Sequence, residues 1–135
     1  MLVEGNAQGE VLALTEPLSF WGGVHEETGR VTDVHHPQHG ACIAGRILVM
    51  PSGRGSSSSS SVLAEMIRAG VGPAAIVLGV RDPIIALGAL VADALYRRSV
   101  PVVVLPPDEY ARVATMGHAR VRGIDGVVDV QSGDD

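Results

Sequence analysis

Three short apolar runs constrain the fold of this chain more than any other feature. They are GRILVMP at residues 45–51, PAAIVLG at residues 73–79 and VPVVVLPP at residues 100–107. Each is bounded by glycine or proline and has an apolar interior, which is typical of a strand buried on both faces. Because a helical pattern follows each of the first two runs, the order strand–helix–strand–helix–strand predicts a parallel sheet with right-handed crossovers.

Both intervening segments predict helices. The first has its apolar residues on one helical face and a glycine placed to end it, namely Val62, Leu63, Met66, Ile67 and Gly70. The second opens with Asp82 as N-cap and Pro83 at the first helical position, and it extends to about residue 97. Because this second helix is apolar nearly all round, we expect other parts of the structure to cover it well.

The two ends of the chain have shorter patterns. Residues 9–17 alternate before a proline, and a further short strand is expected at residues 30–34, so the first third is expected to be β-rich. Residues 119–131 predict one or two more strands, and residues 132–135 should fray. The sequence therefore predicts an α/β fold in a single domain of residues 1–135, with a core of Val, Ile, Leu and Ala because only 3% of residues are aromatic.

The composition excludes several classes of function. All ten basic residues are arginine and the net charge is −5, so a Walker-type phosphate loop and Schiff-base chemistry are excluded, and nucleic acid is disfavoured as a partner. Cys42 is the only cysteine, which rules out an internal disulfide and a cysteine-ligated cluster within this chain. No signal-peptide pattern occurs and no apolar run reaches the ~18 residues of a membrane span, so we expect a soluble, cytoplasmic protein.

The serine-rich segment PSGRGSSSSSSVLAEMIRAG, residues 51–70, lies between a predicted buried strand and a predicted amphipathic helix. Ligands bind at the carboxyl ends of parallel strands, where the next helix offers free N–H groups and its positive dipole end. Gly53 and Gly55 permit close backbone approach, and Arg54 suits a carboxylate or phosphate. This pattern predicts an anion site, with an ordinary N-capping turn as the alternative; a flexible linker is disfavoured because the flanking elements leave no slack.

Other chemical interpretations of the motifs are weaker. GRGSSS matches a dinucleotide fingerprint only with serine in the last place, and the next strand does not end in an acidic residue. The G-x-S-x-G elbow of serine hydrolases is absent. His35, His36 and His39, with Cys42 nearby, could gather zinc, but a second ligand pair at zinc-site spacing is missing, and clustered loop histidines are usually solvated.

The segment EPLSFWGGV, residues 16–24, holds the only Phe and the only Trp of the chain. Neighbouring side chains on an extended chain point to opposite sides, so we expect at least one ring to be exposed. Exposed aromatic rings on a glycine-rich loop suit a partner surface or a substrate wall. The alternative is that Trp21 closes one end of the core.

The motifs SFWGGVHEETG, HPQHG, GRILVMPSGRGSSSSS, PAAIVLG and IIALGALVA occur in this order. With them, residues 5–129 resemble the small subunit of the aconitase X dehydratases. The resemblance implies a swivelling β/β/α domain that docks on a large subunit, which would carry an iron–sulfur cluster or iron. It also implies a hydro-lyase active site at the joint. The serine run and the SFWGG loop favour the forms that dehydrate cis-3-hydroxy-L-proline to pyrroline-2-carboxylate; a phosphomevalonate dehydratase and a non-catalytic anion-binding or regulatory module are the alternatives.

The resemblance also assigns residues to roles. Ser56, the first serine after Arg-Gly, would be the general base that removes the proton beside the substrate carboxylate, while the partner's iron assists departure of the hydroxyl. A helix N-terminus and Arg54 would stabilise negative charge on the serine oxygen. The remaining site residues are expected to be Arg54, Gly55, Ser57 and Ser58 for substrate binding, Ser19, Phe20, Trp21, Gly22 and Gly23 as a partner or active-site loop, and Ser59, Ser60 and Ser61 as the polar first turn of the helix.

Overall fold

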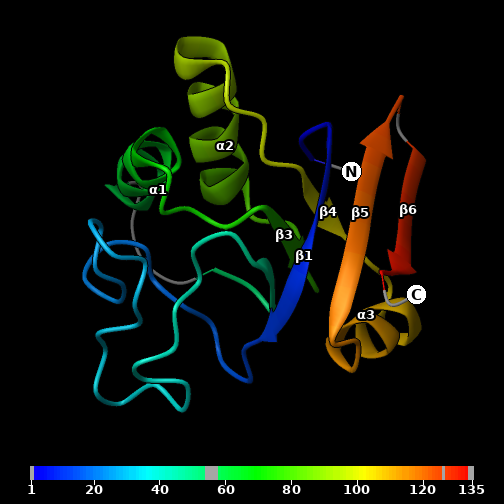
Figure 1. The fold of residues 1–135 in the computed structure, drawn as a ribbon, viewed down its shortest axis with the longest axis horizontal. Coiled ribbons are helices and arrows are strands. Elements are labelled where there is room, and N and C mark those ends of the chain that lie inside the picture. Colours follow the sequence, from blue (N-terminus) through cyan, green and yellow to red (C-terminus); the bar gives the residue numbers. More distant parts are fainter. Residues whose placement is uncertain (1, 54–57, 126, 134–135) are drawn as a thin grey trace.

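The computed structural model describes residues 2–53, 58–125 and 127–133, which form one curled six-stranded sheet with three helices. In the sheet the strands follow the order β4-β3-β2-β1-β5-β6 (Figure 1). The elements are β1 (Gly5–Ala13), β2 (Ile47–Met50), α1 (Ser58–Ala69), β3 (Ala75–Leu78), α2 (Pro83–Tyr96), β4 (Val102–Val104), α3 (Pro107–Ala114), β5 (His118–Ile124) and β6 (Val127–Ser132).

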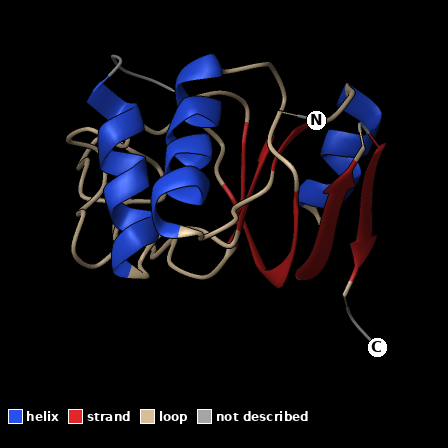
Figure 2. Ribbon diagram, turned by 90° about the horizontal axis from the view of Figure 1, so that it is seen from above, coloured by secondary structure: helices blue, strands red, loops and turns tan. Residues whose placement is uncertain are grey.

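The three apolar runs form β2, β3 and β4, which are parallel neighbours as predicted. Helices α1 and α2 cover one face of the sheet, and α3 covers the other (Figure 2). Because successive side chains of a strand point to opposite faces, β2 and β3 contribute to two cores. Leu48, Met50, Ile76 and Leu78 pack with α1 and α2, whereas Ile47, Val49, Ala75 and Val77 pack with α3, β5 and β6.

Strand β1 is long because it pairs with two different strands. Residues 11–13 pair in parallel with β2, and residues 5–10 pair antiparallel with β5. Upstream of β1, Val3 forms a bridge with Val102, so the N-terminal segment lies along the outer edge of β4. The strand expected at residues 30–34 forms only isolated bridges, of Val31 with Val24 and of Arg30 with Cys42, and β1 is the one extended strand among the described residues of the first third.

The sequence did not predict α3, which has eight residues and a single fully buried side chain, Val113. The signals were present but weak: Pro107 at the start of the helix and acidic residues, Asp108 and Glu109, in its first turn. Strands β5 and β6, residues 118–124 and 127–132, pair antiparallel, and they confirm the one or two short strands that the C-terminal pattern predicted. No helix in the described ranges is long and apolar enough to cross a membrane.

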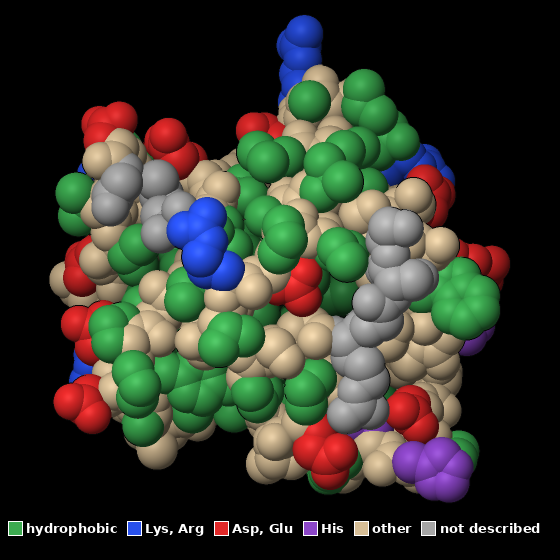
Figure 3. All heavy atoms as spheres, turned by 180° about the vertical axis from the view of Figure 1, so that it is seen from behind, with side chains coloured by type: hydrophobic (Ala, Val, Ile, Leu, Met, Phe, Trp, Pro, Cys, Tyr) green, Lys and Arg blue, Asp and Glu red, His purple; other side chains and the backbone are tan. Residues whose placement is uncertain are grey.

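The prediction that α2 is well covered is wrong for one side of the helix. Its small residues, Ala86, Gly88, Ala89 and Ala92, are buried. At Gly88 the fit against α1 is so close that an added Cβ would lie 2.8 Å from the backbone oxygen of Ser60. On the opposite side, large apolar side chains face solvent: Leu87 is 51% exposed, Leu90 48% and Leu95 67%. Hydrophobic side chains gather on this part of the molecule in Figure 3.

Candidate functional site at the carboxyl ends of the parallel strands

The segments that flank the serine turn, residues 54–57, meet at the edge of the sheet formed by the carboxyl ends of its parallel strands. Gly53 follows β2, Ser58 begins α1, and Asp82 is the N-cap of α2, directly after β3. As predicted, the Asp82 side chain accepts hydrogen bonds from the backbone N–H groups of α2, and Gly70 ends α1 with a positive φ of 82°. This edge is where ligands bind in parallel α/β sheets, and two helix N-termini point toward it.

Four of the predicted site residues, Arg54, Gly55, Ser56 and Ser57, lie outside the described residues. The next predicted residue, Ser58, is the first residue of α1 and is exposed. Ser59, Ser60 and Ser61 stand in the first turn of α1 as predicted, but Ser59 is buried, which the sequence did not predict. The structure therefore places both ends of the turn and distinguishes the serines that begin the helix.

The SFWGG loop is attached to this edge by a parallel bridge between Leu18 and Gly53. Within the loop, the Ser19 hydroxyl donates a hydrogen bond to the Trp21 carbonyl oxygen at 2.8 Å, and the Gly23 N–H donates to the Ser19 carbonyl at 3.1 Å. Gly22 has a φ of 83°, a conformation that favours glycine. At Gly23 an added Cβ would collide with the Ser19 carbonyl oxygen, so both glycines are required by the tight turn.

This turn separates the two aromatic rings. Phe20 is 1% exposed and belongs to the core beside α1, whereas Trp21 is 63% exposed. The expectation that one ring is exposed is confirmed. The alternative, in which Trp21 closes one end of the core, is wrong because Phe20 occupies that place.

We expect Phe20→Ala to lower the free energy of unfolding by about 3–5 kcal/mol, because it empties a fully buried position. Trp21→Ala should change it by no more than about 0.5 kcal/mol, since most of the indole is already in water. Urea denaturation of the two variants checks this matched pair. Similar losses in both would contradict the arrangement of the loop.

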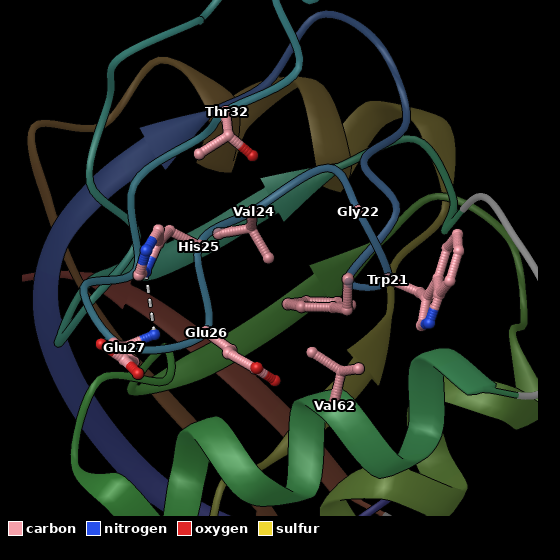
Figure 4. A pocket seen from close by; sticks show the side chains of 9 residues that line it. Trp21, Gly22, Val24, His25, Glu26, Glu27, Thr32 and Val62 are labelled. Carbon is pink, nitrogen blue, oxygen red and sulfur yellow. Dashed lines mark hydrogen bonds between the residues drawn. The ribbon is translucent and has the colours of Figure 1, made fainter.

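Beside Trp21 is a hollow of about 380 Å³ between the loop and α1. Figure 4 shows Trp21 at one end and His25 with Glu27 at the other, where the Glu27 N–H donates to His25 Nδ1 at 3.1 Å. The lining residues are Phe20, Trp21, Gly22, Val24, His25, Glu26, Glu27, Thr32 and Val62. Glu26 and Glu27 bring two carboxylates to this lining, and its described residues include no arginine, so the described part of the hollow favours a cationic group over an anion.

In the histidine-rich segment, residues 35–39, the ring of His36 forms hydrogen bonds within the protein. His36 is buried; its Nδ1 accepts a hydrogen bond from the Gln38 N–H at 3.0 Å, so its Nε2 is the protonated nitrogen and donates to the Glu16 carbonyl oxygen at 3.1 Å. Cys42 lies apart, with Sγ 3.5 Å from the Thr28 carbonyl oxygen. Across the described ranges, no three His, Cys, Asp or Glu side chains are gathered as metal ligands, so these residues do not fit an iron–sulfur cluster.

Comparison with known proteins agrees with this architecture. The aconitase X swivel domain family matches residues 1–130. In solved structures, a chain of "Thermococcus kodakaraensis aconitase X (holo-form)" superposes with a TM-score of 0.80 at 37% identity, covering 96% of this chain and 93% of that chain. A "UPF0107 protein" solved by solution NMR gives the same TM-score at 34% identity, covering 96% of this chain and 94% of that one.

Curated relatives carry two different names. A "Cis-3-hydroxy-L-proline dehydratase" from Hypocrea jecorina is 43% identical over 98% of this chain, and one from Pseudomonas aeruginosa is 51% identical over 77%. The matched parts are only 22% and 18% of those relatives, so this chain spans about a fifth of their length. A "Phosphomevalonate dehydratase small subunit" from Methanothermobacter thermautotrophicus is 42% identical over 81% of this chain and 79% of its own length. From the family match, the shared fold and these identities, the chain belongs to the aconitase X swivel domain family.

Proposed function

We propose that this chain is the small subunit of a hydro-lyase and completes an active site shared with a large subunit. The observation that carries the proposal is the agreement in extent with the phosphomevalonate dehydratase small subunit, in which the match spans about four fifths of both chains. The dehydratase names of the longer relatives support the same reaction class. Residues 1–135 would then act as one domain against the rest of the enzyme.

The substrate we propose is cis-3-hydroxy-L-proline, which would lose water to give pyrroline-2-carboxylate. The 51% identity to the Pseudomonas aeruginosa dehydratase supports this choice. Phosphomevalonate is the second candidate, because the small subunit named for that substrate is 42% identical and matches over most of its length. Both substrates present a carboxylate next to the carbon that loses a proton.

In this proposal Ser56 is the general base and Arg54 helps to hold negative charge at the turn. The described structure supports the electrostatic part. Helix α1 begins at Ser58 and has no acidic residue in its first turn, so its positive dipole end favours negative charge before Ser58. The proton beside the substrate carboxylate would pass to the Ser56 oxygen. When bound by the partner, iron or an iron–sulfur cluster would supply the Lewis acid that assists departure of the hydroxyl.

A large partner also accounts for the exposed side of α2. Its outer stripe consists of Leu87, Leu90, Ala94 and Leu95, and Asp93 is the only charged residue of the helix. An apolar stripe of this size is unusual on a free surface and is typical of an interaction site. We propose the large subunit as its occupant, because in the longer relatives the matched part is joined to a further stretch of chain roughly three and a half times the length of this chain. The Trp21 ring and the acidic hollow beside it would face the same partner.

The test is an activity assay with and without a large subunit. We expect the isolated chain to be inactive, and its mixture with a cysteine-bearing aconitase X large subunit to dehydrate cis-3-hydroxy-L-proline. Dehydration of phosphomevalonate instead would identify the second substrate. If the assembled pair dehydrates neither compound, the chain is better described as an anion-binding regulatory module.

A further inference from the structure

Ser59 differs from the serines on either side of it. It is 3% exposed, and its Oγ is fully buried without a hydrogen-bond partner among the described residues. Ser58 and Ser61, in contrast, are exposed on the same helix. A buried hydroxyl without a partner is costly, and nearly all such groups in folded proteins are paired with protein or with ordered water. The position of Ser59 therefore calls for a partner beyond the side chains around it.

A cavity beside Ser59 has the right size for such a partner. Its volume is about 30 Å³, above the roughly 10–15 Å³ that a cavity needs to hold one water molecule. Among the described residues that line it, Ser59 and Asp82 have polar side chains, and Gly53 lies against the Asp82 carboxylate. The remaining lining is apolar and comes from the SFWGG loop and α2, namely Leu18, Phe20, Ile84 and Ile85.

The Asp82 carboxylate has capacity for another hydrogen bond. Both of its backbone hydrogen bonds end on Oδ1, which accepts from Ile84 N–H at 3.0 Å and from Ile85 N–H at 3.2 Å. The other oxygen, Oδ2, lies against Gly53, where an added Cβ would collide with it. A carboxylate oxygen accepts more than one hydrogen bond, so Asp82 can take a bond from a water while it caps α2.

We propose that Ser59 and Asp82 bind one water molecule in this cavity. The water donates one hydrogen to the Asp82 carboxylate and forms a second hydrogen bond with Ser59 Oγ. It thereby connects the first turn of α1 to the N-cap of α2 across Gly53. The volume suits a molecule of the size of water, and the carboxylate disfavours an anion. The site is separate from the anion site proposed for the serine turn, and its existence does not depend on the enzyme's activity.

The link matters for the geometry of the turn. Gly53 and α1 are the two described ends between which residues 54–57 run. Asp82 lies against Gly53. A water that fixes the first turn of α1 relative to Asp82 therefore also fixes the distance between Gly53 and Ser58. That this spacing matters for activity rests on the proposed function, in which Arg54 and Ser56 carry the chemistry.

The sign of a stability change tests the site. If a water binds Ser59, Ser59→Ala removes one of its hydrogen bonds, and the urea midpoint of the full 135-residue chain should fall below that of the wild type. If the hydroxyl has no partner, the same substitution removes a desolvation cost and adds a better helix former, so the midpoint should rise. Ser61→Ala is the matched control, because it makes the same change on the exposed side of α1. A midpoint for Ser59→Ala at or above that of Ser61→Ala overturns the proposal.

A crystal structure of the wild-type chain gives a second test that needs no variant. We expect one water within about 2.6–3.2 Å of both Ser59 Oγ and an oxygen of Asp82. A dry cavity, or a direct Ser59–Asp82 hydrogen bond with no water, overturns the proposal. Neither measurement involves substrate, so failure of the dehydratase assay leaves both results interpretable, and a dry cavity leaves the proposed reaction untouched.

Discussion

Ser56→Ala is expected to lower kcat/KM of the assembled enzyme on its hydroxy acid by at least about 10²–10⁴-fold, the usual contribution of a general base. Alanine cannot accept the proton that leaves the carbon beside the carboxylate. The side chain lost is small and polar, so the fold and the contact with the large subunit should remain. The measurement is the rate of dehydration, together with size-exclusion chromatography to show that the two subunits still elute together.

Ser61→Ala is the control for this prediction, because it removes a hydroxyl from the same serine run at an exposed position of α1. It should leave the rate within about two-fold of the wild type, since such a surface change has little energetic effect. If Ser56→Ala retains the wild-type rate, Ser56 is not the base. If the variant no longer associates with the large subunit, the loss of rate reports assembly rather than proton transfer.

Most of the parallel core could be predicted because it depends on patterns within short segments. The apolar runs around Leu48, Ile76 and Val103 each form a strand that is buried on both faces, and such strands have few alternatives. The N-cap at Asp82 and the stop at Gly70 are likewise local signals. Helix α3 was missed because it is short and depends on packing across the sheet rather than on a strong pattern of its own.

The site was predicted less completely, for two physical reasons. The burial of Ser59 follows from extending the apolar stripe of α1 back by one turn, because Ser59, Leu63 and Met66 lie at helical spacing and are all buried. That signal was available, but the uniform serine run obscured it. The cavity that Ser59 shares with Asp82 depends on the α1–α2 packing, which joins residues that are distant in sequence.

The exposed side of α2 shows a different limit of prediction from sequence. A helix that is apolar all round predicts cover on every side, and that rule assumes that the whole covering structure belongs to the same chain. Here Ala89 and Ala92 pack inward while Leu87 and Leu95 remain in solvent. If the proposed large subunit covers this side, the apolar pattern of the sequence describes the assembled enzyme rather than the single chain.

The double variant Leu87→Asp/Leu90→Asp tests that explanation and should weaken binding of the large subunit by about 100-fold or more. Burying a leucine side chain contributes about 1.5–3 kcal/mol, and these two are already half covered, so their joint loss is of the order of 1.5–3 kcal/mol. Two carboxylates placed in an apolar interface add a desolvation cost. Each tenfold change in Kd corresponds to about 1.4 kcal/mol, so a total loss of about 2.8 kcal/mol weakens binding about 100-fold. Isothermal titration calorimetry of the pair measures the change.

The same substitutions should leave the isolated chain folded, because both side chains are about half exposed and aspartate costs only about 0.5–0.7 kcal/mol per helical position. Val127→Asp is the control: this apolar residue is 67% exposed on β6, at the far edge of the sheet, and its replacement should leave Kd unchanged. Wild-type affinity in the double variant would show that the large subunit docks elsewhere. If instead the wild-type chain alone forms a dimer that the double variant abolishes, the stripe is covered by a second copy of this chain.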